Sequence, residues 1–457
     1  MPAAGHGYDP VPVCCAQQAP DANPAPADKP AQDVPAEAPA SAYPDRDPLY
    51  FWFWGTATNQ QEHFKSVLCK WYNESQDKYE LILEFRGSVD ADIPVALAAG
   101  QGPDIVYASG LSYTATYAQS DLVLDLTPYA EQYGWKDRLL GVMYDACTLD
   151  GKLYSLPGGL LVGGLFYNKE IFTEQNWEVP ATMDELIATM DAAKAAGYYP
   201  LGAGNKGWKP CNDHFSSMAM GSYLPASYIY KAMTGEISFS DPAIVEAVQK
   251  SAEWYQAGYF AGADYVNLDS SEVMQTITNK KSAMVAAPFL YFQWIDPTFE
   301  GSIGFTTMPN AYTDHSVYNV SMTSSYAINA NSKAPDECAK ILDYMMTGEF
   351  VLAMNAEWPA YWNLPIKELP SMDGSSLSGL AKTCFDAVQA AIPEIDAGYF
   401  YYHPSIFYPA ATVTAFENID VVWQGVQTAE QFCADVAKEL ESDINKNLVP
   451  PLAEPAV

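Results

Sequence analysis

The sequence is poor in basic residues and contains no cluster of them. Its 457 residues include 23 Lys and Arg against 56 Asp and Glu, which gives a formal net charge of −33 at pH 7. Nucleic acids and anionic membrane surfaces are bound through clustered Lys and Arg side chains. We therefore expect no nucleic-acid partner and no binding to an anionic lipid surface.

Long apolar runs and metal-binding cysteine spacings are also missing. No apolar run approaches the roughly 20 residues that a transmembrane helix needs. The eight cysteines are scattered and form no C-x-x-C motif, which argues against a zinc site. Their spacing leaves open whether any of them pair. We expect neither a metal nor a cofactor.

The short motifs of several enzyme classes are absent as well. The sequence has no G-x-S-x-G, no H-E-x-x-H and no G-x-x-x-x-G-K-[ST] phosphate loop, and its five histidines are dispersed. We therefore expect a protein that is not an enzyme. Glycosidases need only two opposed carboxylates, and 56 acidic residues always offer some pair, so a secreted carbohydrate-active enzyme stays as an alternative.

Aromatic residues, by contrast, are abundant. The chain has 31 Tyr, 19 Phe and 11 Trp. Most of these rings must belong to hydrophobic cores, which a chain of this length can form twice. Sugar sites also need flat apolar rings to cover the C–H faces of pyranoses. The surplus favours a carbohydrate ligand.

Residues 1–48 are rich in Pro and Ala and lack the apolar side chains of a core. Such a composition predicts an extended, disordered spacer. The cysteines at 14 and 15 near its start resemble the lipid-bearing cysteine of a bacterial lipoprotein tether. However, neither a charged segment nor an apolar segment precedes Cys14, and Pro12-Val13 differs from the usual small-residue lipobox. Whether Cys14 or Cys15 carries a lipid stays open.

Strand and helix patterns alternate from residue 49 onward. Leu49–Trp54 is apolar throughout and predicts a buried strand, and Tyr79–Phe85 predicts a second strand. Between them, Asn59 and Glu62 have the spacing of a capping box that starts a helix. Strands separated by helices predict the beginning of a parallel, doubly wound sheet.

Two further capping boxes lie later in the chain. Thr182 with Glu185 and Thr428 with Gln431 each precede an apolar pattern of helical spacing. The four glycines between the first and second groups of elements have two interpretations, a flexible crossover or close packing of backbones in a sheet. These glycines are Gly158, Gly159, Gly163 and Gly164.

The stretch from Ala98 to Asp125 is the one around which the chain is organised. Asp104–Ala108 is a short apolar run with a Gly-Pro turn before it and Ser-Gly after it, which predicts a buried strand. We interpret Asp104 itself as a strand-end residue. Ligands of open α/β sheets bind beyond the carboxyl ends of strands, so the Ser109–Tyr113 loop is expected to face a ligand.

Several motifs in this order resemble the bacterial extracellular solute-binding protein family 1, whose members serve sugar ABC transporters. The motifs are Gly102-Pro-Asp104 with its strand, Tyr117-Ala-Gln-Ser120, Gly151-Lys-Leu-Tyr154, Tyr167-Asn-Lys169, Pro180-x-Thr-x-x-Glu185 and Ala327–Lys333. Each motif is short, but together they cover roughly residues 49–446. The resemblance implies an α/β fold with two lobes, similar to periplasmic binding proteins, and three crossovers of the chain between the lobes.

The resemblance also implies how the chain divides. Lobe 1 is expected to comprise residues 49–156 and 316–356. Lobe 2 is expected to comprise residues 157–310 and 360–450. The ligand of such a protein lies in the cleft between the lobes, and binding closes them.

Candidate ligand contacts follow in part from the positions that match the maltose receptors of the family. There, Trp54 and Leu161 replace polar contacts and Ala108 replaces a stacking ring, which argues against maltose itself. Other rings in loops or at strand ends are added as replacements, although core packing is the commoner role for any single ring. The residues that we expect to contact the ligand are Trp54, Thr56, Tyr113, Trp208, Phe289, Trp294, Trp358, Tyr361 and Tyr408.

The expected function is that of an extracellular carbohydrate receptor at the cell surface. It would bind a mono- or oligosaccharide as a monomer and deliver it to the membrane permease of an ABC transporter. Polyamine receptors use carboxylates between aromatic walls, which this acidic chain also offers, so a polyamine or peptide receptor stays as a second alternative. Calcium at Asp264–Asp269 is disfavoured, because the segment lacks the glycine and the final Glu of an EF-hand loop.

Overall fold

The computed structural model describes residues 41–207, 209–295, 299 and 302–457. Most of the predicted spacer, with Cys14 and Cys15, lies outside these residues. Residues 41–46 are already attached to the folded part of the chain. The Ala42 amide donates to Glu80 Oε1 (2.8 Å), and Arg46 Nη1 donates to the Asn73 carbonyl (2.6 Å).

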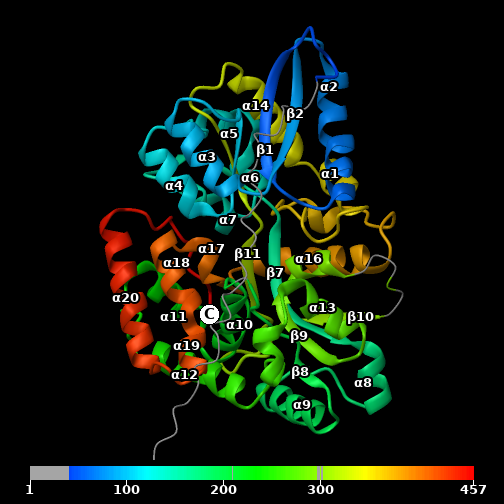
Figure 1. Cartoon of the computed structure of the whole chain (residues 1–457), viewed down its shortest axis with the longest axis vertical. Helices are drawn as coiled ribbons and strands as arrows, with labels where there is room; N and C mark the ends of the chain where they lie inside the picture. The colour runs from blue at the N-terminus through cyan, green and yellow to red at the C-terminus, as the bar shows by residue number, and fades with distance from the viewer. Residues whose placement is uncertain (1–40, 208, 296–298, 300–301) are drawn as a thin grey trace, which may run out of the picture. The chain divides into compact units, whose positions relative to one another are not determined.

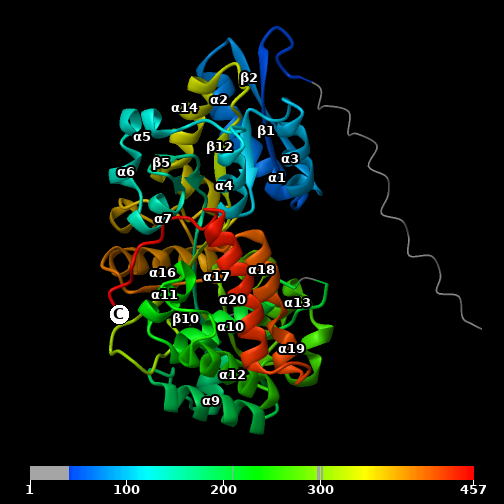
Figure 2. The ribbon, with the colours of Figure 1, turned by 90° about the vertical axis from the view of Figure 1, so that its left-hand side faces the viewer.

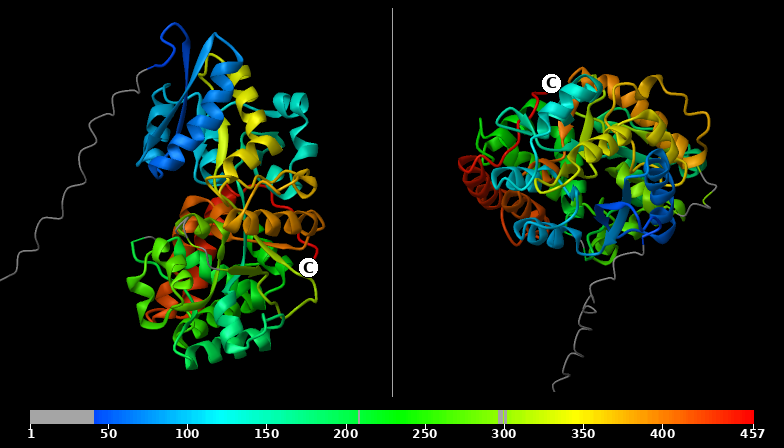
Figure 3. Two further views of the ribbon diagram at one scale, coloured as in Figure 1. Left: turned by 90° about the vertical axis from the view of Figure 1, so that its right-hand side faces the viewer. Right: turned by 90° about the horizontal axis from the view of Figure 1, so that it is seen from above.

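A five-stranded sheet organises the first lobe, with the strand order β2-β1-β3-β12-β6. β1, β2 and β3 are parallel, as expected, whereas β12 runs antiparallel to β3 and β6. β12 comes from much later in the sequence, and Figure 3 shows this yellow segment among the blue and cyan elements. The strands are β1 (Asp47–Trp54), β2 (Tyr79–Arg86), β3 (Ile105–Ala108), β6 (Leu156–Pro157) and β12 (Ser325–Ile328).

Helices lie on both sides of β1 and β2 in this lobe (Figure 1). A short hairpin, β4 (Thr148–Leu149) with β5 (Lys152–Leu153), turns at Asp150-Gly151, where both residues have positive φ. The helices are α1 (Thr58–Phe64), η1 (Lys65–Cys69), α2 (Lys70–Ser75), α3 (Val89–Ala98), α4 (Leu111–Gln119), α5 (Thr127–Tyr133), α6 (Trp135–Arg138), α7 (Gly141–Ala146), α14 (Pro335–Met345) and α15 (Gly348–Asn355).

A six-stranded sheet organises the second lobe, with the order β13-β11-β7-β9-β8 and with β10 paired to β7. β7 is antiparallel to β9, β10 and β11, while β8 is parallel to β9 and β13 to β11. The strands are β7 (Leu160–Asn168), β8 (Tyr199–Leu201), β9 (Ser282–Pro288), β10 (Ile303–Thr306), β11 (Tyr318–Met322) and β13 (Phe400–Tyr402).

The helices of the second lobe include α18 and α20, which pack side by side (Figure 2). The helices are α8 (Lys169–Gln175), α9 (Met183–Ala195), α10 (Cys211–Tyr223), α11 (Ala226–Thr234), α12 (Pro242–Gln256), η2 (Gly262–Asn267), α13 (Ser270–Thr278), η3 (Phe289–Trp294), η4 (Leu369–Ser371), α16 (Gly379–Asp396), α17 (Pro404–Phe407), α18 (Ala410–Phe416), η5 (Glu417–Ile419), α19 (Asp420–Trp423) and α20 (Ala429–Asn445).

Within the described residues the chain passes between the sheets three times, which confirms the expected fold class. It passes from β6 to β7, from β11 to β12, and from α15 to α16. Backbone hydrogen bonds join the three crossing segments to one another. The Gly158 amide donates to the Ser324 carbonyl (2.7 Å), Thr323 to Gly159 (2.9 Å) and Leu160 to Asn363 (2.6 Å). The exact residue limits proposed for the lobes stay a prediction.

The four crossover glycines allow neighbouring segments to pack closely against their backbone. A Cβ on Gly159 would collide with the Tyr361 carbonyl oxygen, and one on Gly163 with the Met218 side chain. A Cβ on Gly158 would lie 2.5 Å from Ser324 Oγ, and one on Gly164 would lie 2.6 Å from the Phe305 ring. Gly158, Gly159, Gly163 and Gly164 are absent from the glycines with positive φ, so their backbones do not require glycine for conformational reasons.

Most local predictions agree with the structure, and two do not. The capping boxes at Thr182 and Thr428 are formed. The one at Asn59 was wrong, because the N-cap is Ala57, two residues earlier, and it makes no side-chain cap. β1 was expected to be buried throughout, but only every second residue is, and the exposed face of Trp52 is covered by the Arg86 guanidinium 3.4 Å from the ring centre.

Asp104 has the strand-end role that was expected for it. Its Oδ2 accepts from the Tyr50 amide (2.9 Å) and its Oδ1 from Ser332 Oγ (2.7 Å), which ties β1, β3 and the end of β12 together. The six cysteines from Cys69 onward are free thiols. No helix among the described residues is both long enough and apolar enough to cross a bilayer.

The packing of Gly159 gives a testable prediction. Gly159→Ala should destabilise the protein, because the new methyl group collides with backbone rather than with a flexible side chain. Overpacking of this kind costs about 1–3 kcal/mol and should lower the melting temperature by several degrees. Gly141→Ala is the control, since a Cβ there meets nothing within 4 Å. Equal melting temperatures for the two variants would contradict the packing role.

Candidate ligand-binding site

The carboxyl ends of the parallel strands β1, β2 and β3 lie at one edge of the first sheet. These strands end at Trp54, Arg86 and Ala108, so the loops that follow gather at this edge. Ligands of α/β sheets bind at such an edge. Thr56, in the loop after β1, is half-buried and bonded to Gln60.

A polar chain of side chains follows β3 at this edge. Tyr107 Oη lies 3.1 Å from Ser109 Oγ, and Ser109 Oγ donates to Asp90 Oδ1 (2.7 Å). Asp90 comes from the first turn of α3 and is exposed. The edge therefore presents the half-buried Ser109 hydroxyl and the Asp90 carboxylate, which are groups that pair with polar ligands.

An aromatic cluster stands beside these polar groups. Trp54 Nε1 donates to Tyr361 Oη (2.9 Å), and the Tyr361 ring stacks on Trp358 with ring centres 4.8 Å apart. Tyr361, Trp358 and Trp362 are buried, and burial raises the pKa of Tyr361 to about 12. Trp54 is half-buried, so it is the ring of this cluster that keeps an accessible face.

The second lobe touches this edge through α17. α17 contacts α4, and a Cβ on Gly110 would lie 3.4 Å from the Ile406 carbonyl oxygen. Tyr113, in the first turn of α4, is half-buried. Its pKa is raised by burial, then by the charges of Asp90 and of Glu417. Tyr113 therefore marks the place where the lobes face each other.

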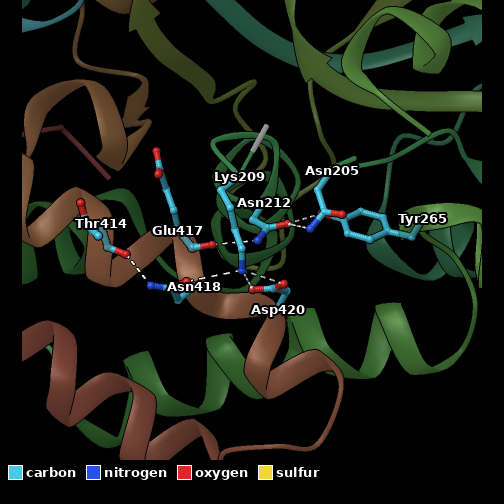
Figure 4. Close-up of polar contacts among 8 residues, drawn as sticks. All are labelled: Asn205, Lys209, Asn212, Tyr265, Thr414, Glu417, Asn418 and Asp420. Atoms are coloured by element: carbon cyan, nitrogen blue, oxygen red, sulfur yellow. Dashed lines mark hydrogen bonds and ion pairs between the residues drawn. The ribbon is translucent and has the colours of Figure 1, made fainter. Parts of the chain in front are cut away.

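Glu417 projects from a firmly held segment of the second lobe. Its carbonyl accepts from Asn212 Nδ2 (2.7 Å), and Asn212 Oδ1 accepts from Tyr265 Oη (2.6 Å) and Asn205 Nδ2 (2.9 Å). On the other side, Lys209 Nζ donates to Asp420 (2.8 and 3.0 Å). Figure 4 shows the Glu417 side chain extending away from this network, with no dashed line to its carboxylate. A preorganised backbone that presents a carboxylate without a hydrogen-bond donor, as far as the described residues go, is a typical feature of a binding site.

The surroundings of Glu417 favour its neutral form. Burial raises the pKa of Glu417 to about 7, the nearby Asp213 charge adds to the rise, and Lys209 opposes it. Glu417 was not among the residues expected from the sequence. It follows an apolar helix in a stretch without a motif, and only the tertiary structure brings it opposite Tyr113.

The remaining residues expected at the site lie elsewhere or in packed surroundings. Phe289 is fully buried among Phe166, Phe292 and Phe305 of the second lobe. Tyr408 is also fully buried, beside a small cavity of about 10 Å³. In this conformation neither ring has a face for a ligand.

Trp294 is half-buried, with its ring centre 4.9 Å from that of Tyr291. Trp208 lies outside the described residues. At two of the positions that differ from the maltose receptors, Ala108 and Leu161 are both 3% exposed. A ligand role for the residues expected from the sequence stays a prediction.

A buried Ser–His–Asp arrangement lies behind Glu417 in the second lobe. His403 Nε2 is 3.0 Å from Asp213 Oδ2, and His403 Nδ1 is 3.0 Å from Ser217 Oγ. The three residues are at most 3% exposed. A substrate cannot reach a serine in this position.

Comparison with known proteins identifies the family of the chain. A model of the family described as bacterial extracellular solute-binding protein matches residues 72–349, which is more than half of the chain. The chain belongs to this family.

Relatives within the wider set of binding proteins are distant. A putative binding protein of Brucella abortus is 26% identical over 253 residues, covering 54% of this chain and 59% of that protein. A multiple sugar-binding protein of Streptococcus mutans is 28% identical over 209 residues, covering 43% and 48%. The chain thus spans about half the length of the curated relatives it matches.

Solved structures agree with the family fold. A structure from work on xylan utilization by Caldanaerobius polysaccharolyticus superposes with a TM-score of 0.73 at 22% identity, covering 86% of this chain and 99% of that one. A chitin oligosaccharide binding protein superposes with a TM-score of 0.72 at 18% identity, covering 87% and 99%. These identities are low, so the likeness shows the two-lobe fold alone. The family is one of extracellular binding proteins.

The raised pKa of Glu417 predicts a pH-dependent effect on stability. Because the folded state favours the neutral carboxyl, the fold loses stability as the pH rises from the ordinary range of a glutamate through about 7. Glu417→Gln removes this loss and should raise the melting temperature at pH 8 more than at pH 5. Glu178→Gln, at an exposed carboxylate, should change neither value. A gain of equal size at both pH values would contradict the burial of the Glu417 charge.

Proposed function

We propose that this protein is a carbohydrate receptor that releases its sugar to the permease of an ABC transporter. The observation that carries the proposal is the contact between α4 of the first lobe and α17 of the second, at a place where the charges of Asp90 and Glu417 both act on Tyr113. A ligand held there contacts both lobes. Binding energy would then be available to stabilise a closed conformation of the lobes.

The chemistry of this edge suits a sugar. Trp54 offers an accessible ring for the C–H face of a pyranose, next to the half-buried Thr56. The carboxylates of Asp90 and Glu417 can accept hydrogen bonds from sugar hydroxyl groups, and Tyr113 can donate or accept one. The names of relatives support the same ligand class, since one of them is a multiple sugar-binding protein.

We also propose that binding takes place without turnover. The Ser217–His403–Asp213 arrangement is buried and closed to substrate. Asp213, the acidic neighbour that raises the pKa of Glu417, is 0% exposed, so it cannot act on a substrate as the second carboxylate of a glycosidase. A lipid anchor at Cys14 or Cys15 and a monomeric state complete the proposal.

A polyamine is the second candidate ligand. Asp90 and Glu417 both act on Tyr113, so the space around this ring is acidic. Protonated amines are attracted to such a place, and aromatic faces bind cations. The two ligand classes are separated by experiment.

Calorimetric titration with a panel of mono- and oligosaccharides, and separately with spermidine, tests the function. Heat and saturation with at least one sugar, without sugar release from an oligosaccharide on prolonged incubation, are expected. If no sugar gives a heat of binding and spermidine does bind, the polyamine proposal would replace the carbohydrate one. Hydrolysis of a bound oligosaccharide would overturn the proposal of binding without turnover.

Substitution of Trp54 tests the site itself. Stacking on one ring buries roughly 60–100 Å² of sugar surface, worth about 1.5–2.5 kcal/mol at 25 cal/mol/Å². Trp54→Ala should therefore weaken the affinity about ten- to seventy-fold in calorimetry. Trp177→Ala is the matched control, a half-buried tryptophan that packs on Phe172 of the second lobe. It should lower the melting temperature and leave the affinity unchanged; a Trp54→Ala variant with unchanged affinity would exclude Trp54 from the site.

A further inference from the structure

A buried carboxylate of α10 holds the start of α17. Asp213, in the first turn of α10, is 0% exposed. Its Oδ2 lies 3.0 Å from His403 Nε2 and accepts from the Ser405 amide (2.8 Å). His403 is the N-cap residue of α17, and Ser405 lies within that helix. One carboxylate oxygen therefore makes two contacts with the beginning of α17.

His403 is also fixed from its other side. Its Nδ1 is 3.0 Å from Ser217 Oγ, and its amide donates to the Val320 carbonyl of β11 (2.9 Å). The side chain is 1% exposed. The ring thus approaches Asp213 through Nε2 and is hydrogen-bonded to Ser217 through Nδ1, so both of its partners belong to α10 and it links α10 and β11 to α17.

The charges around the pair are consistent with an ionised carboxylate. Burial would raise the pKa of Asp213, but the His403 charge and the hydrogen bonds to Asp213 outweigh this effect and hold the pKa below its usual range. Burial lowers the pKa of the neighbouring His214 to about 3, so that ring is neutral. The charge of Asp213 also contributes to the raised pKa values of Tyr408, after α17, and of Glu417 in η5.

α17 is one of the parts of the second lobe that contact α4. The Ile406 carbonyl lies against Gly110, directly before α4, and Tyr113 is in the first turn of that helix. The far end of α4 is held separately, because Gln119 Nε2 donates to the Lys446 and Asn447 carbonyls (3.1 and 2.9 Å). A shift of α17 therefore changes the surface against which the Ser109–Tyr113 segment rests.

We propose that the Asp213–His403 pair positions α17 for ligand binding, so that the apposition of α17 and the Ser109–Tyr113 segment, and with it the affinity, depends on this pair. The inference rests on the proposed function for its affinity readout. The pair itself does not touch the ligand, because both residues are buried. Removing one partner of a buried polar pair leaves the other without its contact, whereas a pair of neutral groups of similar shape is tolerated.

Three variants test the pair: Asp213→Asn, His403→Gln and the double variant. Each single substitution should weaken sugar affinity at least tenfold, because it disrupts the contact between Asp213 and His403 that positions the start of α17. The double variant places an amide next to an amide and should regain most of the affinity. Affinities of both single variants within twofold of the wild type, measured on folded protein, would overturn the proposal.

Matched controls separate positioning from general stability. Asp443 is a buried carboxylate of the same lobe that accepts from Thr412 Oγ1 (2.8 Å) and holds α18 rather than α17. Asp443→Asn should lower the melting temperature and leave the affinity unchanged. Loss of affinity equal to that of Asp213→Asn would show that any damage to this lobe weakens binding, and would overturn the proposal.

A milder pair of variants serves if the charged residues cannot be replaced without unfolding. Ser217→Ala removes one contact of the His403 ring and should weaken affinity about threefold or more. Ser222→Ala is its control, since Ser222 is a buried serine of the same helix that donates to the Met218 carbonyl (3.1 Å). Equal affinities for these two variants would overturn the proposal.

Hydrogen exchange gives a readout that needs no ligand. Amides of residues 110–113 should exchange faster in Asp213→Asn, or in Ser217→Ala, than in the corresponding controls. If the wild type binds no sugar of the panel, the proposed function fails while this measurement still decides the positioning role. Unchanged exchange at residues 110–113 in both variants would overturn it.

Discussion

The close approach of three backbone segments between the lobes is the constraint on which the rest of this structure depends. Gly158 and Gly159 leave no room for a side chain, because the Ser324 and Tyr361 segments lie directly against them. Hydrogen bonds between the segments replace the side-chain contacts that are missing. The two sheets are thereby joined through the backbones of the crossing segments. Short connections of this kind between two lobes are where hinge motions of ligand-induced closure take place.

The candidate site also combines segments from both lobes. The first lobe contributes the loop after β3, and the second contributes a carboxylate on a segment held by Asn212 and Lys209. Neither contribution surrounds a ligand alone. Partial burial raises the pKa values of Tyr113 and Glu417, and the charge of Glu417 in the second lobe adds to the rise at Tyr113 in the first. The buried pair behind it, Asp213 with His403, keeps α17 in the place that creates this proximity.

Much of the fold could be predicted because its signals are local. The capping boxes at Thr182 and Thr428 and the strand–helix order from β1 to β3 depend on neighbouring residues, and the structure has them. The error at Asn59 has a physical cause as well. A capping box is only one of several ways to start a helix, and here the chain leaves β1 through a turn that places Ala57 at the N-cap without a side-chain cap.

The sequence by itself determined the family, the two-lobe α/β fold and the strand that precedes Ser109, because motifs and apolar periodicity are written along the chain. The loop expected over Ser109–Tyr113 was wrong in part, because α4 begins at Leu111. Tertiary structure alone decided which rings stay accessible. Phe289 and Tyr408 are aromatic residues like Trp54, and all three were expected to contact the ligand. Both, however, are enclosed by residues distant in sequence. It also decided that Glu417 stands opposite Tyr113. Burial and pairing of charges depend on contacts between distant segments, and no pattern within a single segment contains that information.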